Sequence, residues 1–289
     1  MSELHTPVGL SEIVADYDVV LCDVWGVVHN GREAFPQACD ALTRFNEAGG
    51  QAVLISNSPR PRDGMIAQMD QLGVPRSAWK AVVTSGDATR AEIERRAPGP
   101  VLALGPERDL PFYEGTGAVL VEDAAEAAFI SCTGLLDDDV EGPEDYRALL
   151  KPLAERGLDF VCANPDRVVQ RGDKLIWCAG ALADVYEELG GRVIMAGKPH
   201  APIYDLAIKE AEALLGRSVD RSRVLAVGDG VITDVMGANA QGLDCLFVAA
   251  GIHGTKARGA DGRIDAGRAA ALLAEETAYA RYAMLDLVW

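Results

Sequence analysis

The chain has 289 residues, 49% of them hydrophobic, and its 44 acidic and 27 basic residues give a net charge of −17. This length exceeds that of a usual single domain, so we expect two domains or one core with a large insertion. Such an acidic surface repels nucleic acid and anionic membranes, which excludes both as expected partners. No signal-peptide pattern and no apolar stretch of membrane-spanning length occurs, so we expect a cytoplasmic location.

Short apolar runs alternate with amphipathic segments along the chain. The alternation predicts an α/β fold with parallel sheets that carry helices on both faces. The expected strands are 18–23, 52–56, 81–84, 101–104, 127–132, 159–163, 192–197, 223–228 and 244–250. The expected helices include 38–48, 63–72, 87–96, 146–156, 201–215 and 233–241. The tail, 269–289, is helical in pattern, and we expect it to pack on the core, with an oligomer contact as the alternative.

The middle of the chain has its own strand and helix set, with Pro- and Gly-rich punctuation near 97–100 and 141–143. We therefore expect residues 1–88 and 191–289 to form one core domain and residues 89–190 to form an inserted α/β domain. An insertion also explains how residues near both ends of the sequence can face the same ligand.

The cysteines are at positions 22, 39, 132, 162, 178 and 245, and no two form a CxxC pair. Those at 22, 132, 162 and 245 lie within apolar runs. We expect reduced, buried thiols, as in a cytoplasmic protein.

Several apolar runs end in polar residues that are followed by a turn. The first run ends at Asp23, the second at Ser56-Asn57, and the run 223–228 is followed by Asp229, while the run 192–197 is followed by Lys198. If these strands share one parallel sheet, their carboxyl ends meet at one edge, where such folds bind ligands.

The acids of this set suit phosphoryl transfer. A carboxylate such as Asp23 can attack phosphorus and form an aspartyl-phosphate. Bringing two anions together requires a cation such as Mg²⁺, which prefers oxygen ligands. Asp229 supplies a second carboxylate between two glycines, and Asp234 begins the next helix, where it can orient water bound to the ion.

The remaining members of the set can bind the phosphoryl group. Ser56 and Asn57 offer a hydroxyl and amide donors at a strand–helix junction. Lys198, held between Gly197 and Pro199, is a cation that can bind the transferred phosphoryl group and keep Asp23 ionised.

The combination resembles the haloacid dehalogenase (HAD) superfamily of Mg²⁺-dependent phosphohydrolases, and within it subfamily IIA, the 4-nitrophenylphosphatase-like or NagD-like branch. The resemblance covers nearly the whole chain and implies a Rossmann-like doubly wound core with an inserted type-2 cap that selects the substrate. The motifs are Asn30-Gly31, Ile55-Ser56-Asn57-Ser58, Cys162-Ala163-Asn164-Pro165-Asp166, Gly197-Lys198-Pro199, and Gly228-Asp229 with Thr233-Asp234.

Position 25 departs from the family pattern. The family usually has a second Asp there, which protonates the leaving group, whereas this chain has Trp25. An indole N–H is neither an acid nor a base near pH 7. In the family the metal binds the backbone carbonyl of this residue, so the resemblance implies Mg²⁺ held by Asp23, the Trp25 carbonyl and Asp229. His29 or His253 is a candidate for a replacement proton shuttle. The alternative is that both are residues at the rim of the site without a catalytic role.

We therefore expect a cytoplasmic Mg²⁺-dependent phosphatase of a small phosphorylated metabolite, such as a sugar or aryl phosphate. The alternatives are a phosphometabolite-binding or regulatory protein with weak hydrolase activity and a phosphotransferase. Trp25 is either a wall against the substrate or a packing residue, and Asn164 and Asp166 either contact the substrate or form an ordinary turn. The oligomeric state stays open, with a homo-oligomer as one alternative.

Overall fold

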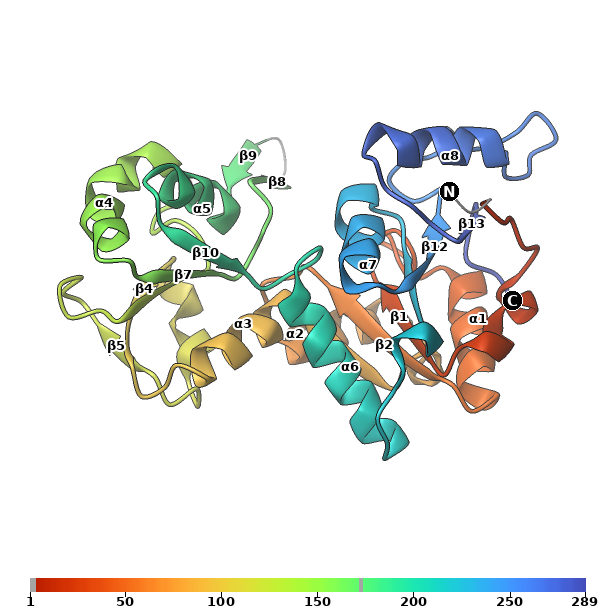
Figure 1. Ribbon diagram of the computed structural model, residues 1–289, viewed down its shortest axis with the longest axis horizontal. Coiled ribbons are helices and arrows are strands. Elements are labelled where there is room, and N and C mark those ends of the chain that lie inside the picture. Colours follow the sequence, from red (N-terminus) through yellow and green to blue (C-terminus); the bar gives the residue numbers. More distant parts are fainter. Residues whose placement is uncertain (1–3, 172–173) are drawn as a thin grey trace. The chain divides into compact units, whose positions relative to one another are not determined.

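The computed structural model describes residues 4–171 and 174–289, and the chain divides into two compact units. The first unit comprises Met1–Ser56, Asp63–Val83 and Lys198–Trp289, and the second comprises Asn57–Arg62 and Thr84–Gly197. Figure 1 labels the elements of both units. The second unit therefore interrupts the sequence of the first.

The first unit contains a parallel sheet of six described strands in the order β13-β12-β11-β1-β2-β3. β1 lies in the middle, and later strands of the sequence are added outward on either side of it. The winding direction reverses between β1 and β11, which makes this junction the expected ligand site of a doubly wound sheet. The strands are β1 Val19–Asp23, β2 Gln51–Ser56, β3 Ala81–Thr84, β11 Val224–Gly228, β12 Asp244–Val248 and β13 Tyr282–Met284.

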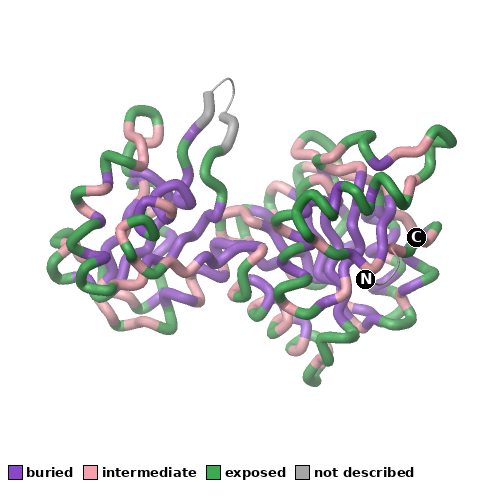
Figure 2. The backbone as a smooth tube through the Cα atoms, turned by 45° about the horizontal axis from the view of Figure 1, so that its top comes forward, coloured by how far each residue is buried: buried purple, intermediate pink, exposed green. Residues whose placement is uncertain are grey.

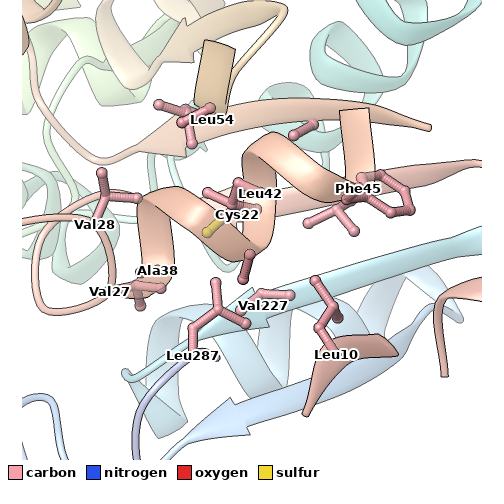
Figure 3. Close-up of a cluster of buried hydrophobic side chains, with 14 of the residues drawn as sticks. Leu10, Cys22, Val27, Val28, Ala38, Leu42, Phe45, Leu54, Val227 and Leu287 are labelled. Atoms are coloured by element: carbon pink, nitrogen blue, oxygen red, sulfur yellow. The ribbon is translucent and has the colours of Figure 1, made fainter. Parts of the chain in front are cut away.

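The helices of the first unit cover this sheet. They are α1 Pro36–Glu47, α2 Arg62–Gln71, α6 Ala201–Leu215, α7 Met236–Gln241 and α8 Ala266–Glu275. α1 begins with Pro36, which suits the first turn of a helix, and turns its apolar face inward. Figure 3 shows Leu42 and Phe45 of this helix in a buried cluster with Cys22, Leu54 and Val227 from the strands.

The second unit has its own parallel sheet, in the order β10-β7-β6-β4-β5. Figure 2 shows that buried residues gather at the centre of each unit and that exposed residues lie around them. α3 begins at a capping box, because Thr84 and Asp87 each bind the other's backbone N–H. The strands are β4 Pro100–Leu104, β5 Val119–Val121, β6 Phe129–Cys132, β7 Asp159–Cys162 and β10 Arg192–Met195, with the antiparallel pair β8 Val168–Arg171 and β9 Lys174–Trp177. The helices are α3 Ser85–Glu94, α4 Arg147–Glu155 and α5 Ala179–Glu188.

The predicted α/β fold with parallel sheets is confirmed, and each of the nine expected strands is present within a few residues of its predicted bounds. The helical tail is wrong in part. α8 ends at Glu275, and Tyr282–Met284 forms β13, fully buried beside β12. Three residues are too few to show the alternation of apolar and polar side chains that marks a strand. Pairing with β12 therefore determines that this segment is a strand. Trp289 packs against the core, as expected.

The six cysteines are free and buried, as predicted for reduced thiols. No helix in the described ranges combines the length and apolar character needed to cross a bilayer.

Truncating the core of α1 should destabilise the first unit. Leu42 is fully buried, so Leu42→Ala should lower its free energy of unfolding by about 2–5 kcal/mol through lost burial and a residual cavity. The matched control is Leu214→Ala on α6, where the side chain is 44% exposed and the expected change is below about 1 kcal/mol. Chemical denaturation measures both, and equal effects would contradict the assigned core.

Candidate active site

Three acidic side chains converge at the junction of β1 and β11. Asp23 is the last residue of β1, and Asp229 directly follows β11. Asp234 lies in the wide turn Val231–Val235, just before α7. All three are buried, and a carboxylate oxygen of each lies within 4.8 Å of the others. The structure thus brings together the acids that strand-end reasoning placed at one edge.

Lys198 joins two of these acids. Its ammonium group donates to Asp23 Oδ1 at 2.6 Å and to Asp234 Oδ1 at 2.7 Å. The side chain of Lys198 is 3% exposed, so both ion pairs are shielded from water. The segment that returns from the second unit, ahead of α6, is therefore tied to the carboxyl end of β1.

The charges in this cluster do not balance. Burial disfavours the charged form of Lys198, but the nearby carboxylates of Asp23 and Asp234 outweigh it, and the pKa of Lys198 is raised. Burial and the negative charge of Asp234 raise the pKa of Asp23, against the opposing effect of Lys198. Burial and Asp234 also raise the pKa of Asp229, to about 6. Three carboxylates facing one ammonium group leave negative charge uncompensated.

Backbone amides hold two of the carboxylates in place. Asp229 Oδ2 accepts from the N–H of Ile252 at 2.7 Å, and Asp234 Oδ2 accepts from the N–H of Gly230 at 3.0 Å. A side chain on Gly251 would collide with the Asp229 carboxylate, so only glycine permits this close approach. The acids are thus fixed before any ligand arrives.

This donor set fits a divalent cation. Mg²⁺ takes oxygen ligands and is usually bound by one or two carboxylates. Asp23, Asp229 and Asp234 supply carboxylate oxygens that lie close together, with an excess of negative charge. Among the described residues, Asp229 makes no ion pair like those that join Asp23 and Asp234 to Lys198. Burial and the charge of Asp234 raise its pKa, and a cation bound there would oppose both effects.

Ser56 and Asn57 follow one another but belong to different units. Ser56 is the last residue of β2, which pairs with β1 so that Asp23 lies opposite Ile55. The buried Ser56 is therefore at the same sheet edge as Asp23. Asn57 begins the short segment Asn57–Arg62 that groups with the second unit.

Trp25 lies in the tight turn after β1. Its ring meets the ring of His29 edge-on, with centroids 5.6 Å apart, and a side chain on Gly31 would collide with the indole. The side chain is nonetheless 56% exposed. It also lines a cavity of about 190 Å³ together with Asp229, so the structure gives Trp25 both a packing contact and a place beside the acids.

The two histidines considered as proton shuttles are both shielded. His29 is 1% exposed, its Nδ1 accepts from the N–H of Gly31, and burial lowers its pKa. The Nε2 atoms of His29 and His253 are buried and make no hydrogen bond within the described part of the chain. Burial also lowers the pKa of His253, so both rings favour the neutral form.

Asn164 and Asp166 lie in the second unit. Asn164 is buried, and its Oδ1 accepts from the N–H of Asp166, which makes an Asx turn. Asn164 also lines a cavity of about 620 Å³ within the second unit. Sequence reasoning did not single out Thr133 and Trp177, which also line this cavity. The strand-end rule, applied to the run 127–132, would have found Thr133.

Comparisons with known proteins agree with this architecture. Residues 20–118 match the family model of haloacid dehalogenase-like hydrolases, and residues 195–273 match a second model of HAD-like hydrolases. A haloacid dehalogenase-like hydrolase from Brucella suis 1330 is 48% identical, covering 98% of this chain and all of that chain, with a TM-score of 0.76.

Two further solved structures are phosphatases by name. A glycerol phosphate phosphatase from Mycobacterium tuberculosis in complex with magnesium is 26% identical, covers 83% of this chain and 70% of that chain, and has a TM-score of 0.64. A p-nitrophenyl phosphatase from Archaeoglobus fulgidus shares the fold, at 21% identity over 94% of this chain and 97% of that chain, with a TM-score of 0.72. The family resemblance found in the sequence is confirmed: this chain belongs to the haloacid dehalogenase-like hydrolase family.

Proposed function

We propose that this chain is a Mg²⁺-dependent phosphatase that hydrolyses a small phosphorylated metabolite, such as a sugar or aryl phosphate. The observation that carries the proposal is the buried cluster of Asp23, Asp229 and Asp234 around Lys198 at the junction of β1 and β11. Structural relatives named as phosphatases, one of them solved with magnesium, support it.

Asp23 is the proposed nucleophile. Its carboxylate oxygen attacks phosphorus, the phosphorus–oxygen bond to the alcohol portion breaks, and an aspartyl-phosphate forms. The alcohol portion leaves as an alkoxide or phenolate, which takes its proton from water. Water then attacks this phosphoryl group, which releases phosphate and restores Asp23. Lys198 stabilises the ionised form of Asp23 before attack and the phosphoryl charge during transfer.

The other residues bind the ion and the phosphoryl group in this proposal. Asp23, the backbone carbonyl of Trp25 and Asp229 would hold Mg²⁺, and Asp234 would orient its water ligands. The ion supplies charge neutralisation and polarises the phosphoryl oxygens when bound. Ser56 and Asn57 would donate hydrogen bonds to those oxygens.

The inserted region has a separate proposed role. Residues 89–190 would act as a cap that selects the substrate and excludes water, over a core made of residues 1–88 and 191–289. The free, buried cysteines support the proposal of a cytoplasmic location.

Trp25 favours a second candidate function, a phosphometabolite-binding protein with weak hydrolysis. General acid–base assistance is worth about 10²–10⁴-fold in rate, and Trp25 supplies none. His29 does not compensate in this structure, because its ring is enclosed. Good leaving groups need no added proton, so turnover of aryl phosphates would suffer least. A phosphotransferase remains the third alternative, and a long-lived aspartyl-phosphate would support it.

Removing the proposed nucleophile should abolish turnover. Asp23→Asn should lower kcat for p-nitrophenyl phosphate by at least about 10³-fold, because an amide does not attack phosphorus. Circular dichroism should show an unchanged fold. The control is Asp40→Asn, an exposed acid on α1, which should keep full activity. Unchanged turnover in Asp23→Asn would refute the mechanism.

Asp229→Asn tests the metal site without any activity measurement. Mg²⁺ should raise the Tm of the native protein but not that of the variant, because binding to the folded state stabilises it. In chelator the difference in stability depends on pH. The pKa of Asp229 is about 6 in the folded protein and 3.8 for an unperturbed aspartate, so the native protein loses stability between pH 4 and 6 that the amide does not lose.

The variant should therefore be more stable than the native protein at pH 8 by up to about 3 kcal/mol, since one pKa unit is worth about 1.4 kcal/mol. Well below pH 3.8 the difference should vanish, because the acid is then protonated in both states. A Mg²⁺-dependent Tm in Asp229→Asn would remove this residue from the proposed ligands.

Restoring an acid at position 25 tests the role of Trp25. Trp25→Asp should raise kcat for glycerol 3-phosphate, a poor leaving group, by about 10²-fold or more, and raise that for p-nitrophenyl phosphate much less. Trp25→Phe, which removes the indole without adding an acid, should not raise either rate. Equal gains on both substrates would show that Trp25 acts by blocking access rather than by lacking a proton.

A further inference from the structure

The second unit has a topological switch point of its own. In the sheet order β10-β7-β6-β4-β5, β4 lies between β5 on one side and β6 on the other. All neighbouring pairs are parallel. The direction of winding therefore reverses between β4 and β6, and parallel α/β sheets bind ligands outside the carboxyl ends of such a pair.

A cavity lies at this position. It has a volume of about 620 Å³, within the range of small-molecule sites, and residues of the second unit line it. Arg108, Asp109 and Phe112 follow β4, and Thr133 and Leu135 follow β6. Topology and volume thus point independently to the same place.

The cavity wall offers flat apolar surfaces. Trp177, the last residue of β9, lines it and is 43% exposed. Pro61, Pro111 and Phe112 line it as well. An exposed indole beside proline and phenylalanine rings is suited to stacking on a flat ring, as aromatic side chains do with bases.

The charges of the wall balance, unlike those of the acidic cluster in the first unit. Two arginines, Arg60 and Arg108, and two aspartates, Asp109 and Asp138, line the cavity. Arg108 donates to Asp138 at 2.6 Å, so this pair is already neutralised. A balanced wall gives no preference for a strongly charged ligand, while its polar side chains can still bind hydroxyl groups.

We propose that the cavity between the carboxyl ends of β4 and β6 binds a small uncharged molecule that carries a flat ring and hydroxyl groups. Trp177 stacks on the ring, and polar side chains of the wall, such as Asp109, bond the hydroxyl groups. The ligand is either the alcohol portion of the substrate or a separate regulator. Only the first of these two identities rests on the proposed function.

The test uses the full-length protein with Mg²⁺ and two ring-bearing probes, adenosine and catechol, beside glycerol as a probe without a ring. Isothermal titration should show binding of at least one ring-bearing probe and at least tenfold weaker binding of glycerol. Trp177→Ala should lower the affinity for the ring-bearing probe at least about tenfold, and Trp177→Phe should keep most of the affinity.

Two controls separate this proposal from the hydrolytic one. Leu120→Ala removes a similarly exposed side chain of the same unit, 44% exposed and outside the cavity, and should leave binding unchanged. Asp23→Asn should also leave binding unchanged, so failure of the hydrolytic mechanism does not affect this test. Lack of binding by both ring-bearing probes, or equal affinity in Trp177→Ala, would overturn the proposal.

The source of the ligand follows from inhibition of p-nitrophenyl phosphate hydrolysis by the bound probe. Competitive inhibition supports the alcohol portion of the substrate as the ligand, and non-competitive inhibition or activation supports a regulator. Either pattern should disappear in Trp177→Ala together with binding.

Discussion

The ion pairs of Lys198 with Asp23 and Asp234 are the constraint on which the site depends. They join the end of β1, the turn before α7 and the segment that leads into α6. A lysine that is 3% exposed stays charged only because carboxylates surround it, and breaking such a buried pair typically destabilises a protein by about 3–5 kcal/mol. The same contacts that fix the geometry of the site therefore also stabilise the first unit.

Both units apply one topological rule to different chemistry. In each sheet the winding reverses beside the strand that begins it, β1 in the first unit and β4 in the second. The first switch point carries buried acids with a surplus of negative charge, which suits a cation and, through it, a phosphoryl group. The second carries aromatic rings and balanced charges. In the proposed mechanism, a cation at the first switch point would let a chain of net charge −17 bind an anionic phosphoryl group.

Much of the fold and of the acidic cluster followed from sequence because both rest on local signals. Apolar runs predicted the long buried strands, and polar residues at their ends predicted Asp23 and Asp229. The sequence did not predict β5 and β13, because each has three residues, too few to show the alternating pattern of a strand. The sequence did not predict Trp177 as a cavity residue for another reason. Its place on the cavity wall depends on the pairing of β9 with β8, which no local sequence pattern encodes.

Trp25 also has an electrostatic consequence that is separate from proton transfer. Three carboxylates and one ammonium group give the cluster a formal charge of −2 when all are ionised, which one divalent cation neutralises. Trp25 lines the same cavity as Asp229, so an acid in its place would add a fourth negative charge beside groups whose pKa values are already raised. That charge would be acceptable only if the acid stayed protonated, which is the state that a general acid requires. In the proposed mechanism, tryptophan at this position therefore offers no acidic proton and adds no charge to the acidic cluster.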